Sequence, residues 1–255
     1  NGMLVGECDE RIEHMKKLIA WILILVLSLS LAACGGKTEP TAATTEAPPE
    51  TTAAPETTEA LETTEEPTVL AKPLYGEILD AYFDALLQGF TPEQYTEKGL
   101  NYLVGVVGDV TKVGYSLEDL DGDGSMELLL GAVGAPEIYA MYTMKDGVET
   151  QIIDAGERSS YRLGTDGVFI NQGSNSAAQS GTMLFTFENG ELHFQDGLVS
   201  DFSVDEKNPW FYVKDQNWDP STYEALDTES AEAIIAQLDA NVRPISYIPF
   251  SEYQS

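Results

Sequence analysis

Four carboxylates lie within nine residues of this chain, in the stretch DLDGDGSME. Carboxylates ~4 to 6 Å apart repel one another, and a bound cation removes that repulsion. Oxygens are hard ligands, which calcium accepts in sets of about six to eight. The sequence therefore predicts a calcium site, and the alternative is a hairpin turn with solvated carboxylates. The candidate ligands are the side chains of Asp119, Asp121, Asp123 and Glu127 and the backbone carbonyl of Ser125.

This stretch shares one feature with the calcium loop of an EF-hand and differs from it in another. Gly124 is its sixth residue, where the loop of an EF-hand turns sharply on a glycine. The twelfth position is Leu130 instead of the glutamate of an EF-hand, and the residues before it have the character of a strand. The stretch instead resembles the shorter DxDxDGxxD loops of integrin-type repeats, with Glu127 in place of their last aspartate. That resemblance covers nine residues and implies calcium as the ligand.

The beginning of the chain has the pattern of an export segment. Lysines follow Met15, an apolar run covers Leu18 to Leu31, and the run ends in Leu-Ala-Ala-Cys at Cys34. We expect residues 1–33 to be a signal peptide whose first fourteen residues come from an overextended reading frame. The ending resembles a bacterial lipobox, which implies a diacylglyceryl group on Cys34 and anchoring by fatty acids such as palmitate. The alternative is an uncleaved transmembrane anchor, although the run is short beside the ~20 residues that a span requires.

Residues 34–72 are predicted to form the lipidated cysteine and a disordered tether. Their composition is dominated by Thr, Glu, Ala and Pro, with almost no residues for a core. Residues 73–255 would then form a single globular domain. From Leu74 onward there are 31 acidic residues and 8 basic ones. Such a surface repels phosphates, so we expect no nucleic-acid partner.

Hydrophobic periodicity predicts an α+β fold for this domain. An apolar residue at every fourth position indicates a helix from Leu74 to about Gln88, and a capping box at Thr91 indicates a second helix towards Leu103. A third helix is expected from Asp227 or Thr228 to about Asn241, followed by an edge strand within Ile245 to Tyr253. The helices would cover one face of an antiparallel β-meander. Its expected strands are Val113–Leu117, Met126–Val133 in the centre, Ile138–Met144, Val148–Ile153, Val168–Asn171, Thr182–Phe187 and Glu191–Phe194. Its expected turns are Asp146-Gly147, Asp166-Gly167, Asn189-Gly190 and Asp196-Gly197.

Three weaker candidates accompany the calcium loop. A small polar loop contains Gly173, Ser174, Asn175 and Ser176. It is either a ligand-binding loop or a plain connection between two strands. The aromatic cluster from Trp210 to Tyr223 is either a platform for sugar rings or part of the core. His193 is expected to face solvent, because the alternation of its strand places it with the polar residues.

The lipobox, the tether and the D-x-DGDGxxELLLG hairpin together are similar to small surface lipoproteins of Gram-positive bacteria. This resemblance implies a location on the extracellular face of the cell membrane, reached through the lipid on Cys34, and implies no particular reaction. We expect a monomeric, non-enzymatic, calcium-stabilised module that binds a cell-wall or host glycan or protein. The alternatives are an extracellular hydrolase acting on wall glycans or peptides, and a structural spacer.

Overall fold

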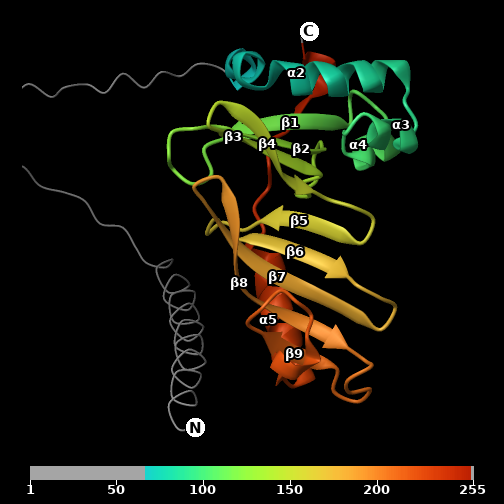
Figure 1. The fold of residues 1–255 in the computed structure, drawn as a ribbon, viewed down its shortest axis with the longest axis vertical. Coiled ribbons are helices and arrows are strands. Elements are labelled where there is room, and N and C mark those ends of the chain that lie inside the picture. Colours follow the sequence, from blue (N-terminus) through green and yellow to red (C-terminus); the bar gives the residue numbers. More distant parts are fainter. Residues whose placement is uncertain (1–66, 254–255) are drawn as a thin grey trace, which may run out of the picture. The chain divides into compact units, whose positions relative to one another are not determined.

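The computed structural model describes residues 67–253 and the side chains from Pro73 onward (Figure 1). The described part is a mixed domain with two antiparallel sheets and four helices, which confirms the α+β class. The expected signal peptide, Cys34 and most of the expected tether lie outside the described residues. Within the described range, no helix has the length and apolar character to cross a membrane.

Three helices precede the first strand. Helix α2 spans Pro67–Gln88, and its backbone leaves the helical region at Tyr75, two residues after the internal Pro73. The predicted capping box is confirmed, because Thr91 and Gln94 exchange hydrogen bonds at the start of α3 (Pro92–Glu97). The expected second helix is split, however, with α4 covering Tyr102–Val107. The break follows from Gly99, whose φ of 70° is incompatible with a continuing helix.

The first sheet has five strands in the order β11-β1-β2-β3-β4. Strand β2 is central, as predicted, and it is apolar on both faces because each face packs against a different cluster. Leu128 and Leu130 pack with α2 and α4, whereas Leu129 packs with the C-terminal segment. The predicted C-terminal edge strand is present as a two-residue pairing with β1. The bounds are β1 Val113–Glu118, β2 Glu127–Ala132, β3 Ala140–Lys145, β4 Val148–Asp154 and β11 Ile248–Pro249.

The second sheet has six strands in the order β10-β9-β8-β7-β6-β5, so the expectation of one meander is wrong. A single bridge, Ile138 with Tyr161, is the pairing between β5 and the segment that precedes β3. The predicted turn at Asp196-Gly197 is also wrong, because both residues lie within β8. Gly197 serves packing there, since a Cβ atom would lie 2.5 Å from the sulfur of Met183. The bounds are β5 Ser159–Leu163, β6 Phe169–Ser174, β7 Gln179–Glu188, β8 Glu191–Asp201, β9 Trp210–Val213 and β10 Glu224–Ala225.

The C-terminal helix α5 spans Thr228–Asn241, and its predicted N-cap is confirmed, because the Asp227 carboxylate accepts a hydrogen bond from the amide of Ser230. It lies against the second sheet, whereas α2 and α4 pack on the first (Figure 1). The expectation that all helices cover one sheet face is therefore wrong. Each sheet has one apolar face that packs against helices, and those helices are the ones nearest to that sheet in sequence. Two short 3-10 helices, Pro220–Thr222 and Phe250–Glu252, complete the described elements.

Candidate metal centre

The loop between β1 and β2 brings three carboxylates together. One oxygen from each of Asp119, Asp121 and Glu127 lies within 4.8 Å of the other two. The hairpin register explains this grouping, because Glu118 pairs with Glu127 and the loop begins and ends at that pair. Asp119 therefore starts the loop beside the residue that closes it.

Glu127 is the buried member of this group, with 1% of its surface exposed. Its Oε2 accepts a hydrogen bond from the backbone amide of Leu120 at 2.9 Å, and its Oε1 accepts one from the hydroxyl of Thr143 at 2.9 Å. Burial raises the pKa of this carboxyl, the two hydrogen bonds oppose the rise, and the charges of Asp121 and Asp123 add to it. A positive charge in the loop would therefore stabilise the ionised form of Glu127.

Asp119 shapes the loop from the exposed side. Its Oδ1 accepts a hydrogen bond from the amide of Gly122 at 2.8 Å, and its Oδ2 accepts one from the amide of Gly124 at 3.1 Å. Both glycines have positive φ angles, 75° and 89°, which side chains rarely adopt. These bonds hold the loop in its turn and keep Asp119 directed towards the loop interior.

Asp121 connects the loop to the second sheet. Its Oδ2 accepts a hydrogen bond from the amide of Gly190, in the turn between β7 and β8, at 3.4 Å. The next residue, Glu191, forms an ion pair with Lys145 of β3 at 2.7 Å. The sequence signal at Asn189-Gly190 indicated a hairpin and gave no indication that its turn packs beside the acidic loop. Thr143 was missed for the same reason, because its position in the alternation of β3 says nothing of its partner.

Asp123, also predicted as a ligand, is not among the three grouped carboxylates. The Oδ1 of Asp123 accepts a hydrogen bond from the amide of Ser125 at 2.7 Å, and Asp123 is exposed. The role of these two residues in binding an ion therefore stays a prediction.

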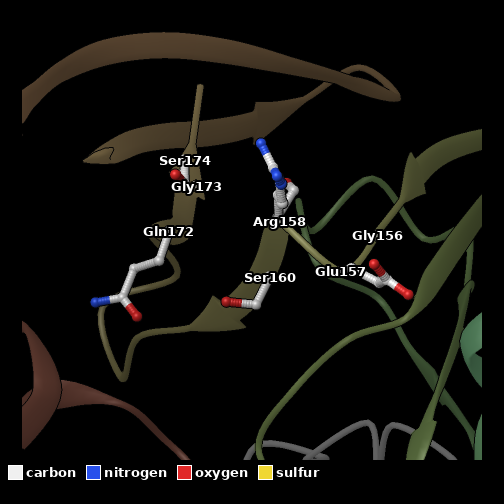
Figure 2. Close-up of a pocket in the computed structure, with 8 residues that line it drawn as sticks. Gly156, Glu157, Arg158, Ser160, Gln172, Gly173 and Ser174 are labelled. Carbon is white, nitrogen blue, oxygen red and sulfur yellow. The ribbon is translucent and has the colours of Figure 1, made fainter. Parts of the chain in front are cut away.

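The predicted ligand loop borders a shallow pocket of about 280 Å³ on the second sheet (Figure 2). Gly173 and Ser174 line this pocket, whereas Asn175 and Ser176 do not. Figure 2 shows the side chain of Glu157 pointing away from Ser160 and Gln172. Glu157 is the one carboxylate among the lining residues, and glycoside hydrolysis usually requires two. The residues that line this pocket therefore do not include the pair of carboxylic acids that glycoside hydrolysis would use.

The aromatic cluster contributes mainly to packing. Phe211 lies in β9 and is 6% exposed, and its ring centroid is 5.1 Å from that of Tyr223 at an angle of 32°. Trp218 packs over Gly181, where an added Cβ atom would lie 2.8 Å from the indole ring. These contacts favour the core interpretation of the cluster. The expected solvent exposure of His193 is confirmed.

No protein-family model, curated protein or solved structure matches this chain. The function proposed below therefore depends on the geometry of the site and on the sequence patterns described above.

Proposed function

We propose that the loop from Asp119 to Glu127 binds a calcium ion and that the ion stabilises a non-enzymatic binding module. The observation that carries this proposal is the grouping of three carboxylates within 4.8 Å, one of them on the buried side chain of Glu127. A buried carboxylate is costly unless it is paired, and two neighbouring carboxylates increase that cost. A divalent cation offsets both effects at once.

Calcium fits the chemistry of this group better than other common ions. All three side chains offer oxygen, which disfavours the transition metals that select nitrogen or sulfur. Asp119 is exposed, so water molecules can complete a shell of about six to eight ligands. Magnesium would require a near-ideal octahedron, whereas calcium tolerates the irregular arrangement of a short loop.

The ion would act on stability by joining parts of the domain that lie far apart in sequence. Asp119 and Glu127 connect the ends of β1 and β2, and the hydrogen bond from Gly190 to Asp121 extends the connection to the second sheet. An ion that binds only the folded state contributes about 2.7 kcal/mol at a hundredfold excess over its Kd.

The test is the melting temperature of the full chain in about 1 mM calcium and in excess chelator. We expect calcium to raise it, and we expect Asp121→Asn to remove the difference. Asp166→Asn is the matched control, because Asp166 is an exposed turn residue whose Oδ1 accepts a hydrogen bond from Val168. Identical melting curves with and without chelator would exclude the proposal.

The location and partners of this module are proposed from the sequence. The lipobox-like ending at Cys34 supports a lipid-anchored module on the outer face of the membrane, where calcium reaches millimolar concentrations. Its partner would be a cell-wall or host glycan or protein. Metabolic labelling with a fatty acid tests the anchor, since Cys34→Ala should abolish the label. Binding to purified wall glycans, compared in calcium and in chelator, tests the partner and separates a binding module from a spacer.

A further inference from the structure

A cavity of about 380 Å³ lies where three separate segments of the domain meet. The loop between β2 and β3 contributes Ala135 and Pro136, β5 contributes Arg162, and the end of α5 with the segment after it contributes Asp239, Arg243 and Pro244. The volume falls in the range of ~300 to 1,000 Å³ that is typical of small-molecule sites.

The charge of this cavity contrasts with that of the domain. Acidic residues outnumber basic ones by 31 to 8 from Leu74 onward, yet two of the three arginines in the described range line this one cavity. Asp239 is the one carboxylate among the lining residues. The lining therefore offers an anion two guanidinium groups inside a strongly negative domain, each already paired with one carboxylate, Asp239 for Arg162 and Glu118 for Arg243.

Arg162 has the geometry of a receptor for that anion. Its side chain is 14% exposed, and its Nη2 donates one hydrogen bond, at 2.8 Å, to Oδ1 of Asp239. A guanidinium carries five N–H donors, so this single bond leaves several for a second acceptor. A carboxylate matches the fork of a guanidinium with two parallel hydrogen bonds.

Arg243 contributes the second positive charge, although its guanidinium already has a partner. Its Nη2 is paired with the carboxylate of Glu118, at the end of β1, and its Nη1 donates to the carbonyl of Pro244 at 3.4 Å. These contacts hold Arg243 in place. The charge of Arg243 is therefore balanced by Glu118, and Arg162 is the arginine that would contact the ligand.

The remaining lining is apolar and sets the nature of the rest of the ligand. Ala135, Pro136, Val242, Pro244 and Ile245 surround the charged group. An apolar wall with a few convergent polar groups is the usual composition of a small-molecule site. A ligand with one carboxylate and a small hydrophobic body would satisfy both parts.

We propose that this cavity binds small organic monocarboxylates with an apolar body, and that the carboxylate is held by Arg162. Asp239 competes with the ligand for the same guanidinium and repels its charge. None of the three grouped acidic residues lines the cavity, so ligand binding should persist in excess chelator. That independence distinguishes a failure of this proposal from a failure of the calcium proposal.

The test is calorimetric titration of the full chain with 3-phenylpropionate, with 3-phenylpropionamide as the uncharged probe of the same shape. We expect the carboxylate to bind with millimolar affinity or better, and the amide at least about tenfold more weakly. Arg162→Met should weaken carboxylate binding by about tenfold or more. Arg158→Met is the matched control, because Arg158 is exposed and lines the other pocket, and it should leave the affinity unchanged.

A gain of affinity provides the decisive result, since misfolding cannot produce it. Asp239→Asn removes the competing carboxylate, and it should strengthen binding of 3-phenylpropionate severalfold without affecting the amide. The proposal is overturned if the carboxylate does not bind at millimolar concentration or if the amide binds equally well. It is also overturned if Asp239→Asn leaves the affinity for the carboxylate unchanged.

Discussion

The hydroxyl of Thr143 on β3 donates a hydrogen bond to the buried Oε1 of Glu127 on β2, at 2.9 Å. Thr143 is itself 2% exposed, so the pair has little access to water. The side chain of Thr143 on β3 therefore positions the buried carboxylate of Glu127 on the neighbouring strand β2. This pairing holds the end of the loop, at Glu127, in the buried part of the first sheet.

Replacing Thr143 by Val should destabilise the domain. The substitution removes the donor and leaves a buried carboxylate oxygen without it, which costs about 1 to 3 kcal/mol. Urea unfolding measures the loss. Thr150→Val is the control, because Thr150 lies directly opposite Thr143 on β4 and, within residues 67–253, its hydroxyl donates only to the carbonyl of Val148. Equal losses in the two variants would show that the bond to Glu127 has no special role.

Gly190→Ala should reduce both stability and the effect of calcium. The residue has a φ of 72°, and an added Cβ atom would lie 3.2 Å from Cε of Lys145. Its amide also donates to Asp121, so a shift of the turn would disturb a proposed calcium ligand.

The matched control is Gly167→Ala. Gly167 has a φ of 81° in another hairpin turn, and an added Cβ atom there would have nothing within 4 Å. Both variants lose about 1 kcal/mol from the positive φ. Only the Gly190 variant should also show a smaller rise of the melting temperature in calcium. The same calcium response in both variants would contradict a link between the two sheets at Asp121.

The domain should lose stability in acid when the carboxylate of Asp201 becomes protonated. Burial by itself would raise the pKa of this carboxyl, but hydrogen bonds from Ser203 and Gln179 outweigh it, and the pKa lies below its ordinary value of 3.8. A lowered folded-state pKa stabilises the fold above the unfolded-state pKa, and the contribution is lost as pH falls through the folded-state value.

Urea unfolding at about pH 7 and about pH 3 tests this linkage. Asp201→Asn should lose stability at the higher pH, by about 1 to 3 kcal/mol, and should differ less from the wild type at the lower pH. A difference between the two proteins that is the same at both pH values would show that Asp201 does not contribute to the acid sensitivity.

Removing the hydroxyl group should affect the stability of the domain differently at two buried tyrosines. The hydroxyl of Tyr82 accepts a hydrogen bond from the amide of Asn101 at 2.8 Å and lies 3.1 Å from that of Tyr142, so Tyr82→Phe should cost about 1 to 3 kcal/mol. The hydroxyl of Tyr95 is buried without a hydrogen-bond partner among the described residues. Tyr95→Phe should therefore be neutral or slightly stabilising. Thermal unfolding of the two variants measures the contrast, and a large loss in Tyr95→Phe would reveal a partner such as a buried water.

The sequence by itself determined the local features of this protein. The capping box at Thr91, the N-cap at Asp227 and the hairpin turn at Asn189-Gly190 each depend on residues close together in the chain, and all three are present. The central position of β2 followed from its apolar character on both faces. The grouping of Asp119, Asp121 and Glu127 also arises within one short loop.

Only the tertiary structure decided what these local features contact. Thr143 lies 16 residues from Glu127, Gly190 lies 69 residues from Asp121, and Arg162 lies 77 residues from Asp239. The division into two sheets was equally hidden, because the alternation of a strand gives its buried face and not its neighbour. Alternation, caps and turns act over a few residues, whereas partners are selected by the packing of the whole domain. The acidic loop could therefore be found in the sequence, and the cavity at Arg162 could not.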